Sequence, residues 1–205
     1  MHLPINNSNS VDTFSTKDDD KVLRNWLDSC EDALFHLYLI LESPHVDEYS
    51  GVKPYFPARG KTGENIYKFL PNILNQKSFK NQGFGSFMKK TASTSPIVVE
   101  AMNSVPYQCS LGIQPICRMM VEENWIYYWY VSNAYKGHGE QDFIDRILTA
   151  NIPGSTFFIN ACTEGVNVPL RQMVSNALEQ VLGPNQNFCE TNHPVSWRSN
   201  NLPTL

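Results

Sequence analysis

Three short apolar runs show almost no alternation between apolar and polar residues, and this pattern constrains the fold more than any other feature. The runs cover residues 37–41, 96–102 and 156–162. A strand with one face in water alternates with a period of two, whereas a strand buried on both faces is apolar throughout. The pattern therefore predicts strands of a mostly parallel sheet that is covered on both sides.

Segments with helical spacing lie between and around these runs. One helix is expected to begin with Thr62 as its N-cap, and another is stopped by Gly183-Pro184. An alternation of strands and helices is typical of layered α/β domains. We therefore predict a three-layer α/β/α sandwich with a central, mostly parallel four-stranded sheet. The expected helices cover residues 20–30, 62–74, 141–148 and 169–182, and a weak last strand is expected around 187–189.

The other segments carry weaker signals. Residues 1–19 are polar and non-periodic, which predicts a flexible N-terminal arm and leaves 20–205 as a single domain. Residues 75–95 resemble an exposed loop. In residues 113–135 aromatic side chains are so dense that helix and strand cannot be separated, and the cluster at 125–130 is expected in the core or at an oligomer contact.

The composition is that of one soluble domain. The chain has 205 residues, of which 41% are hydrophobic and 18% charged, and no apolar stretch is long enough to cross a membrane. Its five cysteines are scattered and form no CxxC pair, so reduced thiols in a cytoplasmic protein are expected. We favour a monomer without membrane contact. The net charge of −4 argues mildly against nucleic-acid binding, although local basic segments matter more than the total.

Polar residues follow the predicted strands where the strands end. Glu42-Ser43-Pro44-His45 follows the first strand, Asn103 follows the second, and Asn192-His193-Pro194 follows the last. Proline cannot continue a buried strand, so the chain turns at Pro44, and the second exit leads into a proline-containing turn at 104–108. Ligands of open α/β sheets bind outside the carboxyl ends of the strands. We therefore expect a carboxylate, an amide and an imidazole to meet at one edge of the sheet.

These exits resemble motifs of the uracil-DNA glycosylase superfamily. The stretch 41–48 is similar to the first motif of its iron–sulfur branch, Gly-Glu-Ala-Pro-Gly-x-x-Glu, with Glu42, Pro44 and Glu48 at matching positions. Four further segments resemble family motifs in the same order along the chain. They are the aromatic and Gly-x-x-Gly segment at 54–63, the Asn-Ala-Val segment at 103–106, the strand-to-helix unit from 158 onwards, and the His-Pro-Ser-Pro-Leu motif at 193–197.

The resemblance implies a DNA glycosylase that hydrolyses the N-glycosidic bond of a flipped uracil or other modified base. Catalysis would fall to Glu42, near the developing sugar cation, and to His193, on the departing base oxygen. Ser43 and Glu48 belong to the same catalytic motif. The base would be bound by Asn103, which offers a donor and an acceptor to a pyrimidine edge, and by Tyr55, Phe56 and His45.

Contacts to DNA are implied on either side of this pocket. Trp197 takes the position of a wedge that fills the gap left by the flipped base. Arg198, Arg59 and Lys61 would contact phosphates, and Lys53, Lys89 and Lys90 would have to complete a basic rim with them. The implied partner is DNA containing a damaged or modified base, and the reaction needs no metal or other cofactor.

The sequence also departs from the family pattern. Leu41 and His45 replace glycines, Ser43 stands where the main branch has a catalytic aspartate, and the four-cysteine cluster pattern is absent. His45 stands where a tyrosine blocks thymine in the main branch, so the accepted base is left open.

Ordinary structural roles are alternatives for these residues. Glu42 could be a capping or salt-bridged carboxylate, His193 a buried structural histidine, Asn103 a turn cap and Trp197 a core residue. A second function class is a non-catalytic or repurposed domain that binds a nucleotide-like ligand or a protein partner. A third is a metal-dependent hydrolase that uses the acids of 42–48 with His45 and His193.

Overall fold

The computed structural model describes residues 12–13, 35–43, 61–91, 97–105, 125–130, 139–150, 155–165, 169–182 and 187–205. The strands in this part of the chain form one sheet in the order β1-β3-β2-β4-β5. β3, β2, β4 and β5 run parallel, which confirms the central four-stranded sheet predicted from the apolar runs. The strands are β1 (Asp12–Thr13), β2 (Phe35–Leu41), β3 (Ile97–Asn103), β4 (Ser155–Asn160) and β5 (Phe188–Glu190).

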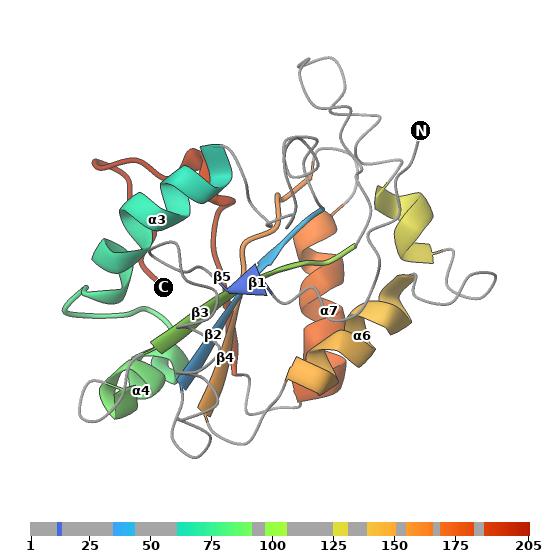
Figure 1. The fold of residues 1–205 in the computed structure, drawn as a ribbon, viewed down its shortest axis with the longest axis horizontal. Helices are drawn as coiled ribbons and strands as arrows, with labels where there is room; N and C mark the ends of the chain where they lie inside the picture. The colour runs from blue at the N-terminus through green and yellow to red at the C-terminus, as the bar shows by residue number, and fades with distance from the viewer. Residues whose placement is uncertain are drawn as a thin grey trace.

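Helices cover both faces of the sheet, so the predicted three-layer architecture is confirmed. α3 (Lys61–Leu74) and α4 (Gln82–Thr91) lie on one side, and α6 (Gly139–Ala150) and α7 (Leu170–Leu182) lie on the other (Figure 1). A short helix at 125–130 and the 3-10 turn η2 (Pro194–Ser196) complete the described elements.

Burial on both faces of β2 explains why this strand does not alternate. Leu37, Leu39 and Leu41 pack into the core cluster beneath α3 and α4, and each is at most 2% exposed. Tyr38 and Ile40 point to the opposite face and pack into a second cluster with residues of α6 and α7. A strand with no face in water has no reason to carry polar residues at every second position.

Helix α4 lies within the stretch that was predicted to be an exposed loop, so that prediction was wrong. Phe84 and Phe87 of α4 are buried against the sheet, and Asn81 caps the helix by accepting the main-chain N–H of Phe84 at 2.8 Å. Gly83 and Gly85 weaken the intrinsic helix propensity of this stretch, and packing of the two phenylalanines outweighs that cost.

The start of α3 and the pairing of Asp12–Thr13 also differ from expectation. α3 begins at Lys61, so Thr62 is its second residue and not its N-cap. Asp12–Thr13, in the segment predicted as a flexible arm, pairs antiparallel with Glu100 and Ala101 of β3.

The order of the parallel strands reverses between β2 and β4. From β2 the chain moves to β3 on one side, and it then returns past β2 to β4 and on to β5. In doubly wound sheets ligands bind outside the carboxyl ends of the strands at such a reversal. The residues that leave β2 and β4 at this edge are therefore the first place to look for a site.

Candidate functional site

Glu42 follows the last residue of β2, and three donors hold its main-chain carbonyl. The hydroxyl of Ser104 donates at 2.6 Å, the indole Nε1 of Trp125 at 3.0 Å and the main-chain N–H of Val105 at 3.2 Å. A carbonyl beyond the end of a strand has lost its ladder partner, and these donors replace it. The point at which Glu42 leaves the sheet is therefore fixed.

The aromatic stretch at 125–130 is part of this support. Trp125 and Trp129 are buried and stacked, with ring centroids 4.6 Å apart, whereas Tyr127 and Tyr130 are exposed. The two tryptophans thus lie in the core, one of the two places expected for this cluster. Trp125 also donates to the Ser104 hydroxyl at 3.0 Å, which ties the exits of β2 and β3 together.

The side chain of Glu42 reaches across the reversal point of the sheet. Its Oε2 accepts a hydrogen bond from the hydroxyl of Thr163, which follows the end of β4. Both residues are half-buried. A carboxylate that is held in this way has a defined direction at the carboxyl edge of the sheet.

His193 lies at the start of the turn η2, and its ring is held in one orientation. The ring Nδ1 accepts the main-chain N–H of Val195 at 3.3 Å, so a neutral imidazole carries its proton on Nε2. Burial lowers the pKa of His193 below its ordinary value, while the nearby carboxylate of Glu42 acts to raise this pKa and Arg171 acts to lower it. The imidazole is therefore neutral at pH 7, with Nε2–H available as a donor.

Arg171 is a charged residue of this site that the sequence analysis did not single out. It lies in the first turn of α7, and its Nε donates to the carbonyl of Cys162 at 3.0 Å. Burial raises the pKa of the Cys162 thiol, Glu42 acts in the same direction, and Arg171 opposes them. The thiol is therefore protonated at neutral pH, and it does not act as a nucleophile.

Asn103, the residue predicted to read the base, ends β3 directly beside the last residue of β2, Leu41. Its main-chain carbonyl accepts from Arg146 Nη1 at 2.7 Å, and the next carbonyl, that of Ser104, accepts from Nη2 at 2.8 Å. The side-chain Oδ1 of Asn103 is buried and has no hydrogen-bond partner among the described residues. A buried acceptor without a partner is unusual and points to a ligand or to another group that completes the site.

The turn η2 is fixed from beneath by one amide. Nδ2 of Asn65, a buried residue of α3, donates to the carbonyls of Pro194 at 2.8 Å and Val195 at 3.2 Å, with a longer contact of 3.4 Å to that of Trp197. The hydroxyl of Ser196 also donates to the carbonyl of His193 at 2.8 Å. The position of His193 therefore depends on packing between α3 and η2.

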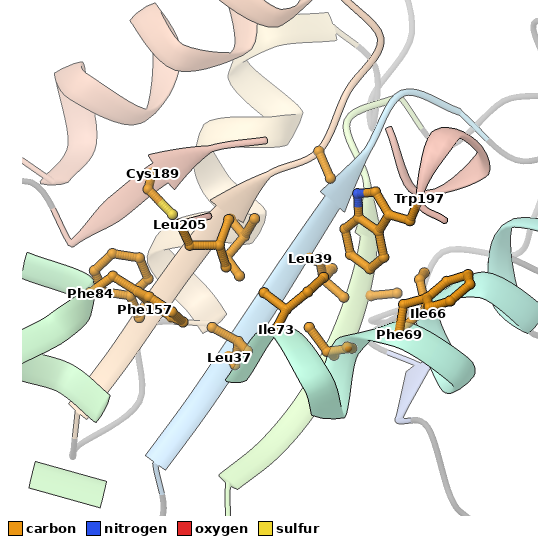
Figure 2. Close-up of a cluster of buried hydrophobic side chains, with 14 of the residues drawn as sticks. Leu37, Leu39, Ile66, Phe69, Ile73, Phe84, Phe157, Cys189, Trp197 and Leu205 are labelled. Carbon is orange, nitrogen blue, oxygen red and sulfur yellow. The ribbon is translucent and has the colours of Figure 1, made fainter. Parts of the chain in front are cut away.

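The structure corrects the expected role of Trp197. Its side chain is 2% exposed and lies in the core with Leu39 and Ile66, as Figure 2 shows. Its indole N–H donates to the carbonyl of Asn192 at 2.9 Å, which satisfies its one polar group. A wedge must be free to enter the base stack, so Trp197 is a core residue that supports η2 and not the wedge that the motif implied.

The remaining predicted residues fall into two groups. Lys61 and Arg198 are exposed, and Ser43 is half-buried next to Glu42. Five further predicted residues lie outside the described part of the chain. These five are His45, Glu48, Tyr55, Phe56 and Arg59.

Several supporting residues had no signal in the sequence. Thr163, Arg146 and Trp125 act through hydrogen bonds to groups that are 40 to more than 100 positions away in the chain. Only the Asp142–Arg146 pair, spaced four apart on α6, could have been expected from the sequence.

Comparison with protein-family models, curated proteins and solved structures finds no match. None of the described helices is long and apolar enough to cross a membrane. In the described ranges, no three His, Cys, Asp or Glu side chains are placed to hold a metal ion. The fold and this edge define an α/β domain with a polar site at the carboxyl ends of its parallel strands.

Proposed function

We propose that this protein is a DNA glycosylase that removes uracil or another modified base by hydrolysis of the N-glycosidic bond. The observation that carries the proposal is the placement of the Glu42 carboxylate, which Thr163 holds at the point where the strand order reverses, near enough to His193 for its charge to act on the pKa of that imidazole. The motif resemblance assigns the same two residues to catalysis, on grounds independent of the fold.

The two side chains are suited to the two charges that develop in this reaction. Loss of the base leaves an oxocarbenium-like sugar, which the carboxylate of Glu42 stabilises while it orients the attacking water. The base departs as an anion, and Nε2–H of His193 donates to its oxygen.

Recognition of the base is assigned to Asn103. The base must leave the stack to reach the edge of the sheet, and its pocket must then satisfy its hydrogen-bonding groups. The Oδ1 of Asn103, which has no hydrogen-bond partner in the described part of the chain, supports this role, because an acceptor is what the N3–H of a uracil-like base requires. Because Arg146 binds the carbonyls of Asn103 and of the following Ser104, the main chain is fixed where β3 ends, and the amide is presented from that strand end.

The biological setting follows from this activity. We place the protein in base excision repair in the cytoplasm, acting as a monomer on damaged DNA. The buried free thiols of Cys162 and Cys189 are compatible with a reducing compartment.

A repurposed domain that binds a nucleotide-like ligand or a protein partner is the second candidate. The acidic net charge of −4 and the substituted motif positions Leu41, Ser43 and His45 favour it. Both candidates use the polar site at the carboxyl ends of the strands, and only the glycosylase needs Glu42 for turnover. A metal-dependent hydrolase is a third candidate, and activity that persists in the presence of chelator excludes it.

The experiment that separates these candidates is incubation with a panel of oligonucleotides. Duplex and single strands carrying uracil, hypoxanthine, xanthine or a substituted pyrimidine are treated with the protein and then cleaved with alkali at abasic sites. A glycosylase gives a cleaved product from at least one substrate. Binding without cleavage across the whole panel would favour the repurposed domain.

A further inference from the structure

We infer that Thr163 is a positioning residue that fixes the carboxylate of Glu42 for the proposed reaction. The hydroxyl of Thr163 donates to Oε2 of Glu42. This hydrogen bond joins the residue after β2 to the segment after β4, and therefore spans the point where the strand order reverses. The contact between the two side chains is given by the geometry alone. Its effect on catalysis rests on the proposed function.

The main chain on the Thr163 side of this contact is held in place. The N–H of Ala161 donates to the carbonyl of Ile40 at 2.8 Å, and the N–H of Cys162 donates to Oδ1 of Asn160 at 3.2 Å. Arg171 then binds the carbonyl of Cys162. Every residue that leads into Thr163 is thus anchored, although β4 itself has ended at Asn160.

The side chain of threonine is also well suited to direct a carboxylate. A β-branched residue has restricted rotation about χ1, so its hydroxyl is held in one direction when the main chain is fixed. A glutamate has three rotatable bonds and loses considerable freedom when it is ordered. With its main-chain carbonyl anchored and Oε2 bound to Thr163, Glu42 is fixed at both ends, and among the described residues Oε1 is the oxygen left for water or the sugar.

This arrangement makes a specific prediction for Thr163→Val, which keeps the shape of the side chain and removes the hydroxyl. We expect kcat for base excision to fall roughly 10- to 100-fold with KM nearly unchanged, because misplacement of a catalytic group acts on the chemical step. Thr163→Ser restores the donor and should recover kcat to within about threefold of the wild type. Thr149→Val is the matched control, since it removes an exposed hydroxyl that donates to the carbonyl of Asp145 on α6.

A readout that does not depend on activity tests the contact itself. The side-chain carboxyl 13C signal of Glu42 is assigned by its loss in Glu42→Gln. It should move in Thr163→Val, stay close to the wild-type position in Thr163→Ser and remain unchanged in Thr149→Val. An unmoved signal in a folded Thr163→Val variant would overturn the inference, and so would a kcat within twofold of the wild type.

The outcomes for the two proposals are distinguishable. If the wild-type protein excises no base from any oligonucleotide, the proposed function is overturned and the carboxyl signal alone decides whether Thr163 orients Glu42. If Glu42→Gln loses excision while Thr163→Val keeps it, the proposed function stands and the positioning role is overturned. If Thr163→Val does not fold, the Thr163→Ala and Thr163→Ser pair is compared, and equal kcat values in that pair would also contradict the role.

Discussion

At the scale of single residues, the pKa of His193 responds to two nearby side chains of opposite charge, Glu42 and Arg171. Burial lowers the pKa of His193, Glu42 opposes this effect and Arg171 adds to it. Glu42→Gln should therefore lower this pKa further, and Arg171→Gln should raise it toward its ordinary value. NMR titration of the imidazole in the wild type and both variants measures the two shifts. Shifts of the same sign in both variants would contradict the arrangement.

The same pKa has a consequence for stability. Because the folded state holds His193 neutral, the unfolded state binds more protons from the lowered pKa up to about 6.5. The contribution of His193 is therefore fully present above about pH 6.5 and is lost as the pH falls toward the folded-state value. The difference in the free energy of unfolding between wild type and His193→Ala, measured in urea from pH 5 to 8, should shrink with acidification. A constant difference would show that the ring is not held neutral by folding.

The stability of a Trp197→Ala variant shows whether Trp197 is a core residue or a wedge. Its indole fills space beneath η2 in the core cluster, so Trp197→Ala should cost about 3–5 kcal/mol of unfolding free energy. Val195, which is 51% exposed two residues earlier, supplies the control, and Val195→Ala should change stability by less than about 0.5 kcal/mol. Urea unfolding measures both. A stable Trp197→Ala variant that loses excision only on duplex DNA would restore the wedge role.

At the scale of elements, the exits of three of the four parallel strands are fixed by side chains that bind main-chain carbonyls. Trp125 and Ser104 hold the exit of β2, Arg146 that of β3, and Arg171 that of β4. Asn65 does the same for η2. The site is therefore supported by polar contacts from helices on both faces of the sheet.

Asn65→Ala tests this support for the turn that carries His193. It removes the side-chain donor from the carbonyls of Pro194 and Val195, of which, among the described residues, only that of Pro194 keeps the main-chain N–H of Trp197 at 3.0 Å, and should cost about 1–3 kcal/mol of unfolding free energy. Excision should fall as well, because His193 lies on the loosened turn. Asn176→Ala is the control, since Asn176 is an exposed amide on α7 that pairs only with Gln172 among the contacts described. Urea unfolding and excision rates are measured on both. Unchanged stability and activity in Asn65→Ala would contradict the role of this amide.

The elements show why the sequence predicted the layers better than the site. Continuous apolar runs indicate strands buried on both faces, and the polar residues after them mark the carboxyl edge, so the fold and the placement of Glu42, Asn103 and His193 could be derived. α4 was missed because its glycines and polar residues conceal the apolar face of Phe84 and Phe87. Trp197 was misassigned because a motif position does not determine whether a side chain points to solvent or to the core.

At the scale of the whole molecule, the proposed activity requires an acidic protein to bind DNA. Lys61 at the start of α3 and Arg198 after η2 are exposed, and their elements contact each other. The exposed pair of Lys61 with Glu64 is weak, so it does not prevent Lys61 from contacting a phosphate. The expectation that Lys89 belongs to the same basic rim was wrong. Lys89 lines a groove of about 930 Å³ with Ile97, the first residue of β3, and so lies at the opposite end of the sheet.

This distribution predicts the salt dependence of binding. Lys61→Ala and Arg198→Ala should each reduce the slope of log K against log salt by about 0.9 on duplex DNA, because each removes one phosphate contact. Lys89→Ala should leave the slope unchanged. Fluorescence anisotropy with a damaged duplex over a range of NaCl concentrations measures the three slopes. Equal slopes for all three variants and the wild type would place the DNA on another face of the protein.

The central claim is that Glu42 catalyses hydrolysis of the N-glycosidic bond that holds a modified base in DNA, and a single-turnover excision rate tests it most directly. The rate is measured for the wild type, Glu42→Gln and Glu64→Gln on the best oligonucleotide of the panel, with Glu64 as an exposed glutamate on α3. We predict that Glu42→Gln lowers the rate on the order of 100- to 1,000-fold, or about 3–4 kcal/mol, while Glu64→Gln retains the wild-type rate. A wild-type rate in Glu42→Gln, or no excision by the wild-type protein from any oligonucleotide, would contradict the account.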